Sequence, residues 1–326
     1  MELLKKLTEF DAPSGRENEI CEFIKSMSQS MGYTVTTDGL GSVIAHKKGN
    51  GKKLMLAAHI DEIGIIANYI DDNGFIRFGA VGGLYTKELL KRRVRFENGT
   101  IGIVADEEKS FKDKAEISKL FIDIGAKNRD EALKYVKIGD TAAFVGDFSV
   151  SGNTVISKAL DDRAGCYILL KTMKNIGDTD NDLYFVFTTQ EEVGIRGAKT
   201  SAFSVMPDYA IAVDVTDTGD TPEAPKMEVK VGGGAAIKVM DRSVLCDMSV
   251  VNTLRHIAET NNIPYTNEIM TDGGTDAGAI ALTGAGVKAG GISIPVRYIH
   301  SPSELADIND INACIDLLTH ACEFNW

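Results

Sequence analysis

Residues 182–197 read DLYFVFTTQEEVGIRG, an apolar strand pattern that runs directly into two adjacent carboxylates, Glu191 and Glu192, and then a glycine. Burial of one unpaired carboxylate is unfavourable, and burial of two side by side is more so. Ligands of open α/β sheets gather at the carboxyl ends of strands, so the stretch predicts a core strand with chemically active side chains at its end. Successive side chains of an extended segment point in opposite directions, and the two glutamates can therefore have different partners.

Helix and strand patterns alternate around this stretch, through residues 1–70 and again through residues 156–326. Strands interleaved with helices of ordinary length predict an α/β domain whose mixed, mainly parallel sheet is flanked by helices. The run KLMLAAH at residues 53–59 is almost continuously apolar, which is typical of a strand buried on both faces. Ser14 and Glu17 have the spacing of a capping box and predict the start of a helix.

The alternation stops between residues 71 and 155, where short strand patterns dominate. Asn73-Gly74 and Asn98-Gly99 predict tight hairpin turns within this segment. We therefore expect a small β-rich domain at residues 71–155, inserted into a larger domain that residues 1–70 and 156–326 form together.

Composition excludes several classes of protein. The chain has 326 residues and a net charge of −12, which argues against nucleic acid as a partner because nucleic-acid binding needs a basic surface. Its 44% hydrophobic and 25% charged residues are typical of a folded protein rather than a disordered or fibrous one. No apolar run approaches the roughly 18 residues of a membrane span, and the N-terminal stretch lacks the apolar core of a signal peptide.

The cysteines indicate a compartment. They are scattered, odd in number and never arranged as CxxC: Cys21, Cys166, Cys246, Cys314 and Cys322. This pattern favours buried free thiols over a disulfide framework or a thiolate zinc site. We therefore expect a reducing compartment, and the cytoplasm is the predicted location.

Polar side chains end five separate apolar runs. They are His59 with Asp61, Asp161 with Asp162, Glu191 with Glu192, Asp214, and His300. Because strand ends meet at one edge of such a sheet, we expect these residues to lie close together. Imidazole and carboxylate without thiolate are the ligands of zinc, cobalt or manganese at a hydrolytic site. The set is large enough for two ions, which together can polarise a carbonyl and generate hydroxide near neutral pH.

The two glutamates can then have different roles at such a metal site. One carboxylate can ligate a metal while its neighbour faces the water as general base. Asp61, two residues past His59, suits a carboxylate that orients the imidazole. Each residue alone also has an ordinary explanation, and Asp161 and Asp162 could simply cap the helix that follows. The coincidence of five such positions is what favours a metal site.

Six motifs carry a resemblance to a known family: AAHIDEIG, ALDDRAG, TTQEEVGIRGA, AVDVT, GGTDAG and RYIHSPSE, in that order. Together with GFIRFGAVGG and LFIDIGAKNRDEA in the expected insert, they resemble the tetrahedral aminopeptidases. That family has dinuclear metal sites and includes glutamyl and deblocking aminopeptidases, with some members labelled endoglucanases. The resemblance covers nearly the whole chain and implies a zinc-peptidase-like catalytic domain.

The resemblance also implies particular roles. Asp161 bridges two divalent ions, zinc or cobalt first and manganese as an alternative. The other ligands are His59 and Asp214 at the outer positions, with Glu192 and His300 completing the set. Glu191 is the general base and Asp61 supports the ligands. The substrates are short peptides that lose their N-terminal residues through attack by metal-activated hydroxide.

The same family implies a homo-oligomer, a dodecamer built from dimers made through the inserted β domain. The stretch 104–118 departs from the family pattern because it is shorter and more charged than the usual loop. The departure bears on assembly and not on the ligand set.

Three other functions share some of these features. A related amidohydrolase, such as an aminoacylase or deacetylase, would use the same metals on substrates without a free amine. A glycosidase needs only two carboxylates, which would leave His59 and His300 without a purpose. A binding protein without activity would not need Glu191. The preferred N-terminal residue stays open, since an acidic preference requires a basic pocket side chain and the candidates near the motifs are Arg163, Arg242 and Arg297.

Overall fold

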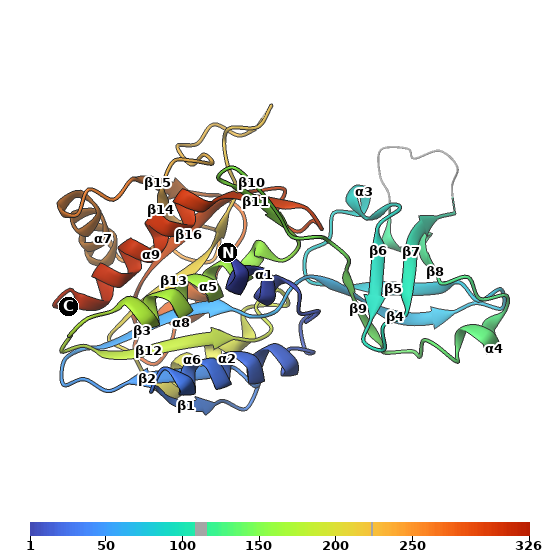
Figure 1. The fold of residues 1–326 in the computed structure, drawn as a ribbon, viewed down its shortest axis with the longest axis horizontal. Helices are drawn as coiled ribbons and strands as arrows, with labels where there is room; N and C mark the ends of the chain where they lie inside the picture. The colour runs from blue at the N-terminus through green and yellow to red at the C-terminus, as the bar shows by residue number, and fades with distance from the viewer. Residues whose placement is uncertain (108–115, 223) are drawn as a thin grey trace.

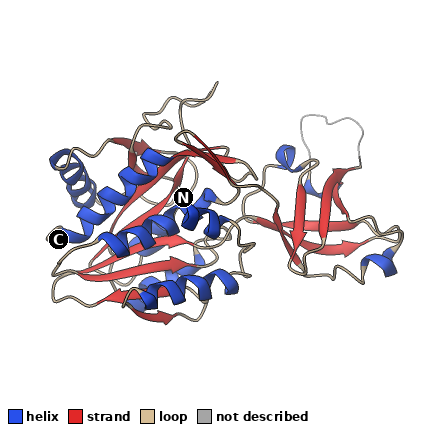
Figure 2. Ribbon diagram, viewed as in Figure 1, coloured by secondary structure: helices blue, strands red, loops and turns tan. Residues whose placement is uncertain are grey.

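The computed structural model describes residues 1–107, 116–222 and 224–326. Two bodies lie side by side in Figure 1. The larger contains an eleven-stranded sheet with helices packed against it, and the smaller is a closed barrel (Figure 2). The mixed α/β architecture predicted from the sequence is confirmed.

The large sheet has the order β1-β2-β12-β3-β13-β16-β17-β11-β10, with β14 paired to β16 and β15 paired to β14. Its strands are β1 (Thr34–Thr37), β2 (Val43–Lys47), β3 (Lys53–His59), β10 (Ser149–Ser151), β11 (Thr154–Ser157), β12 (Asp182–Thr188), β13 (Tyr209–Thr216), β14 (Ala235–Met240), β15 (Tyr265–Ile269), β16 (Lys288–Arg297) and β17 (Glu304–Asp307). Parallel pairing joins the four central strands β12, β3, β13 and β16, and also β14 with β15. The other pairs are antiparallel.

The helices of the larger body are α1 (Glu2–Thr8), α2 (Asn18–Ser30), α5 (Leu160–Asn175), α6 (Arg196–Val205), α7 (Met248–Thr260), α8 (Asp276–Ala281) and α9 (Ile308–Glu323). Nearly every side chain of α5 is buried, because the helix packs on β3 and β13 and also against α1 and α9. Helices α6 and α8 pack on one another and on the central strands. The central strands are therefore mostly apolar, and their charged residues lie at or near the strand ends.

The barrel has the strand order β4-β5-β8-β7-β6-β9 and a hydrophobic core of its own. Its elements are β4 (Gly64–Ile70), β5 (Ile76–Val81), α3 (Thr86–Leu89), β6 (Arg93–Phe96), β7 (Ile101–Asp106), η1 (Ile117–Lys119), β8 (Leu120–Asp123), α4 (Arg129–Ala132) and β9 (Thr141–Phe144). The two predicted hairpins are confirmed as β4–β5 and β6–β7. Gly74 and Gly99 close them at φ of 89° and 86°, a conformation that glycine adopts without strain.

The strands divide between the two bodies at slightly different points from those expected. β4 belongs to the barrel although it lies within residues 1–70, and β10 pairs with β11 of the large sheet although it lies within residues 71–155. An apolar run shows that a segment is buried but not which strand it pairs with. We propose that the barrel unit spans residues 64–144. Residues 108–115 of the unusual loop at 104–118 lie outside the described residues.

The structure also bears on the expectations about membrane-spanning helices and the cysteines. Every helix in the described ranges is too short or too polar to cross a membrane. All five cysteines are free and buried, as the scattered pattern predicted.

Candidate metal centre

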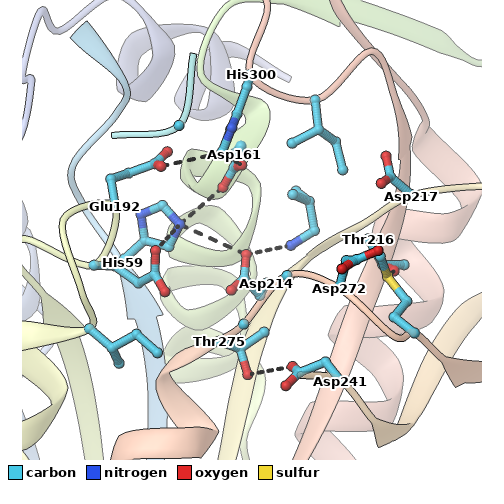
Figure 3. Close-up of a pocket in the computed structure, with 18 of the residues that line it drawn as sticks. His59, Asp161, Glu192, Asp214, Thr216, Asp217, Asp241, Asp272, Thr275 and His300 are labelled. Atoms are coloured by element: carbon cyan, nitrogen blue, oxygen red, sulfur yellow. Dashed lines mark hydrogen bonds and ion pairs between the residues drawn. The ribbon is translucent and has the colours of Figure 1, made fainter. Parts of the chain in front are cut away.

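The ends of β3, β12 and β13 meet the loop after β16 and the first turn of α5 at one edge of the large sheet (Figure 3). Parallel pairing of the central strands brings these distant segments together. All the sequence-predicted residues lie here: His59 ends β3, Asp61 follows it, Asp161 starts α5, Glu191 and Glu192 follow β12, Asp214 is in β13, and His300 follows β16.

Two groups of side chains could each hold a cation. The Nε2 atom of His59 lies 2.9 Å from Oδ1 of Asp161 and 3.8 Å from Oδ1 of Asp214. The Nε2 atom of His300 lies 3.3 Å from Oδ2 of Asp161 and 3.2 Å from Oε2 of Glu192. In each group the three donor atoms lie within 4.8 Å of one another. Asp161 directs one carboxylate oxygen toward each group, which is the geometry of a carboxylate shared by two ions.

The electrostatics of the cluster fit divalent cations. Burial and neighbouring carboxylates raise the pKa of Asp214 and Glu191 well above their ordinary values, although His59 opposes this. The Oε1 atom of Glu192 is buried without a hydrogen-bond partner. Burial lowers the pKa of His300, but Asp161 and Glu192 outweigh it and raise that pKa to about 12. Two buried carboxylates, Asp161 and Asp214, and two half-buried ones, Glu191 and Glu192, face two imidazoles. Two divalent ions would compensate this excess of negative charge.

The paired glutamates point to different partners, but they lie in a turn after the end of β12 and not in the extended segment that was expected. Glu192 contacts His300, whereas Oε2 of Glu191 lies 4.0 Å from Nε2 of His59. Glu191 lines the same cavity but belongs to neither three-residue group. This arrangement leaves Glu191 available to accept a proton beside the two groups.

Asp61 contacts more of the site than the imidazole alone. The Nδ1–H of His59 can donate to the backbone oxygen of Asp61 at 3.1 Å, while the Asp61 carboxylate is 3.6 Å from that nitrogen. The carboxylate accepts the backbone N–H groups of Glu191 at 2.9 Å and Glu192 at 3.1 Å. It also accepts the Ser14 hydroxyl at 2.6 Å. Asp61 therefore fixes the backbone that carries both glutamates.

Ser14 and Glu17 do not form the predicted capping box. Helix α2 begins at Asn18, and its N-cap residue, Glu17, makes no side-chain cap hydrogen bond. The Glu17 carboxylate instead accepts the N–H groups of Gly15 at 2.8 Å and Gln190 at 3.1 Å. The prediction from the spacing was wrong because both side chains bond to other partners. Ser14 donates to Asp61, and Glu17 accepts from the backbone of Gln190, the residue before the paired glutamates.

Two other buried carboxylates hold the backbone of the site. Asp162 accepts the N–H of His59 at 3.2 Å and that of Gly165 at 2.9 Å, so it caps its helix and also contacts β3. Glu304 accepts the N–H groups of Asp161 and His300. Glu304 was not predicted from the sequence, where its place in the motif RYIHSPSE is the only signal of a role.

The candidate ligands of both groups line one cavity of about 600 Å³. The barrel side contributes Gly83, Tyr85 and Glu88 to its lining. Asp217, directly after β13, and Asp272, in the loop before α8, extend the wall of the cavity away from the candidate ligands (Figure 3). The cavity carries several acidic side chains beyond the candidate ligands, among them Asp217, Asp241 and Asp272.

None of the three candidate arginines is among the described residues that line this cavity. Arg163 is buried and donates to the backbone oxygens of Leu7 and Ile60. Arg297 pairs with Asp220. Lys238 does line the cavity, but its ammonium is bonded to two carboxylates, Glu268 and Asp241.

A family assignment follows from comparison with known sequences. The profile of the M42 glutamyl aminopeptidase family matches residues 41–317. The chain belongs to this family. The resemblance that the six motifs suggested is confirmed, and membership makes the protein a peptidase. M42 peptidases are metal-dependent, which agrees with the two candidate groups at the sheet edge.

Relatives of this M42 chain share its whole length. The aminopeptidase APDkam598 from Desulfurococcus kamchatkensis is 39% identical with a TM-score of 0.95, over 99% of this chain and 94% of that one. The Pyrococcus horikoshii TET1 peptidase, which can assemble into a tetrahedron or a large octahedral shell, is 32% identical with a TM-score of 0.89, over 98% of each chain. An Acetivibrio thermocellus protein is 56% identical over 321 residues, or 98% of this chain and 97% of the relative.

Proposed function

We propose that this M42 protein is a dinuclear metalloaminopeptidase that removes N-terminal residues from short peptides. The observation that carries the proposal is the shared Asp161 carboxylate, with one oxygen toward His59 and Asp214 and the other toward His300 and Glu192. Glu191 lies 4.0 Å from His59, lines the same cavity and belongs to neither group. The combination suits hydrolysis of an amide bond by an activated water.

The residues of the chain divide the reaction between them. His59, Asp161, Glu192, Asp214 and His300 would hold two divalent ions, which when bound polarise the scissile carbonyl and make water a better nucleophile. Glu191 takes the proton of the attacking water and later delivers it to the nitrogen of the leaving peptide. Asp61 keeps Glu191 in place by accepting its backbone N–H. The C–N bond breaks, and the products are a free amino acid and a shortened peptide.

Zinc and cobalt are the proposed ions, and the same nitrogen and oxygen donors also accept manganese. Inductively coupled plasma mass spectrometry on protein purified without added metal would identify the resident ion. Two equivalents of zinc or cobalt per chain are expected. Fewer than one equivalent of any transition metal, together with no uptake on dialysis against these ions, would contradict the proposed centre.

We also propose a cytoplasmic homo-oligomer in which barrels form the dimer contact. The Pyrococcus horikoshii relative can assemble into a tetrahedron or a large octahedral shell. Large apolar side chains are exposed on the barrel, namely Tyr69, Ile101, Ile103, Tyr135 and Ile138. Mass photometry should find a dodecamer, and Ile103→Lys should reduce it to smaller species. A wild-type monomer would refute the proposed oligomer. The free buried cysteines support the proposed location in the cytoplasm, which is a reducing compartment.

Aminoacyl-p-nitroanilides with matched N-acetylated controls test the activity. Each substrate is measured with protein as purified, after chelation, after return of zinc or cobalt, and with Glu191→Gln. Turnover should require a free amine, disappear on chelation and return with metal. Equal turnover of acetylated substrates would replace the aminopeptidase with an amidohydrolase of the aminoacylase type. Hydrolysis of glycosides that resists chelation would favour the endoglucanase function.

A further inference from the structure

Glu304, the first residue of β17, is a buried carboxylate with a relative exposure of 2%. It lies next to the second candidate ligand group, which consists of Asp161, Glu192 and His300. Its Oε2 atom accepts the backbone N–H of Asp161 at 3.0 Å. Its Oε1 atom accepts the backbone N–H of His300 at 2.9 Å. One side chain therefore ties together the backbones that carry the shared ligand and the histidine of the second group.

Neither backbone is in a position that ordinary secondary structure holds firmly. Asp161 has non-helical dihedral angles inside the first turn of α5. His300 has φ of 62°, in the left-handed region that a non-glycine residue occupies only when its surroundings hold it there. Hydrogen bonds to a carboxylate are stronger than those to a neutral acceptor, so Glu304 suits this task.

The buried location of Glu304 is unfavourable for a negative charge, so a neutral residue would be expected there unless the charge has a role. A buried carboxylate loses solvation, and the negative charge of Asp161 lies close to it. Glu304 belongs to neither candidate ligand group and does not line the cavity. Within the described residues, its hydrogen bonds to the site run to the two backbone amides.

We infer that Glu304 is a positioning residue that sets the spacing between Asp161 and His300 and thereby the affinity of the second ion. The inference rests on the proposed two-ion centre. Asp61 acts in a comparable way on the other side of the cluster, where it holds the backbone of Glu191 and Glu192. Partners of this kind change metal affinity or activity by about 10- to 100-fold when they are replaced.

The chain contains a matched control. Asp310, in the first turn of α9, is also buried, with a relative exposure of 1%. It accepts the backbone N–H groups of Gly232 at 2.6 Å and Gly234 at 2.7 Å. Its contacts are of the same chemical kind, but they hold a glycine loop and neither ligand group. Asp310→Asn should therefore report the structural effect of neutralising such a carboxylate without the effect on metal.

The experiment compares Glu304→Gln, Asp310→Asn and wild type as full-length chains. Glutamine keeps the shape of Glu304, but its amide N–H₂ faces one of the two backbone N–H groups, so that one hydrogen bond is lost. Calorimetric titration of metal-depleted protein with Co²⁺ measures the affinity of each ion, and the visible spectrum of bound Co²⁺ reports its geometry. Thermal unfolding of metal-free protein measures the structural effect of each substitution.

We expect Glu304→Gln to weaken one of the two ions by about 10- to 100-fold and to change its Co²⁺ spectrum, while Asp310→Asn binds both ions as wild type does. Wild-type affinity for both ions in Glu304→Gln would overturn the inference. Equal weakening in both variants would overturn it too, because the effect would then be structural. If Glu304→Gln does not fold, Glu304→Asp keeps the charge but is one methylene shorter, and the same expectations and refutations apply to it.

The metal measurements separate this inference from the proposed function. If wild-type protein binds two ions but cleaves no aminoacyl substrate, the peptidase proposal fails and the role of Glu304 is still decided by affinity. If wild-type protein binds fewer than two ions, the inference about Glu304 is overturned together with the two-ion centre.

Discussion

The edge of the large sheet and the barrel distribute charge in opposite ways. At the sheet edge, Asp61, Asp161 and Asp214 are all buried. In the barrel, charged side chains pair at the surface, as in Arg77 with Glu107 and in Glu97 with Arg16 from the larger body. Surface pairs contribute little to stability, whereas buried carboxylates require compensation by cations or hydrogen bonds. The difference agrees with the proposed metal centre at the sheet edge, which would supply the compensating charge.

Glu191→Gln should give the largest effect and separate the two regions most clearly. Loss of a general base typically lowers kcat by about 10²- to 10⁴-fold, and the metal content should stay near wild type because Glu191 is outside both ligand groups. Asp130→Asn, on exposed barrel helix α4, is the control and should retain full activity. Full activity in Glu191→Gln would require another base.

Metal removal should destabilise the larger body. At a free ion concentration of 100 Kd, one bound ion stabilises a folded protein by about 2.7 kcal/mol. We therefore expect chelation to lower the Tm by roughly 5 °C or more, and added zinc or cobalt to restore it in proportion to the logarithm of concentration. A Tm that stays constant while plasma mass spectrometry confirms loss of metal would show that the buried charges are compensated within the protein.

Gly83→Ala tests whether the barrel side takes part in the site. A Cβ atom at Gly83 would lie 3.0 Å from Cε1 and Nδ1 of the His300 ring, so that the ring must move. We expect a loss of roughly tenfold or more in kcat/KM, since misplacement by about 1 Å can reduce rates by 10²-fold. Gly79→Ala on β5 is the matched control, because its Cβ would meet Ile66 at an ordinary 3.5 Å. Equal activity of the two variants would separate the barrel from catalysis.

The charge of the cavity predicts a smaller effect on substrate choice. Asp217 and Asp272 face it, and Lys238 is already bonded to two carboxylates. Glutamyl p-nitroanilide should therefore be cleaved at least about tenfold less efficiently than lysyl or leucyl p-nitroanilide, a ratio that corresponds to about 1.4 kcal/mol. Asp272→Asn should reduce the difference in kcat/KM between the glutamyl substrate and the other two, and Asp130→Asn should leave that difference unchanged. A preference for glutamyl substrates would show that Lys238 exchanges partners when substrate binds.

Local patterns in the sequence carried much of the fold and the identity of the candidate ligands. The alternation of strands and helices predicted the mixed sheet, and the two Asn-Gly pairs predicted the barrel hairpins. Strands that end in histidine or carboxylate predicted the residues that now lie together, such as His59 and Asp214. These features are readable because burial and turn geometry impose regular spacing on side chains that are close in the chain.

Contacts between distant segments could not be obtained in this way. Ser14 and Glu17 had the spacing of a helix cap, but the folded chain brings Asp61 and Gln190 within reach of them. β4 continues an apolar run and yet pairs in the barrel. In each case the local pattern was satisfied by two arrangements, and packing selected one of them.

The sequence by itself determined which residue types stand at the strand ends and in what order they occur. Only the tertiary structure decided that Asp161 is shared between two groups, that Asp61 holds the paired glutamates and that Glu304 joins two ligand-bearing backbones. The physical reason is that a hydrogen bond between distant segments depends on relative positions of a few tenths of an ångström. Those positions are set by the packing of the whole sheet and its helices, which no local spacing records.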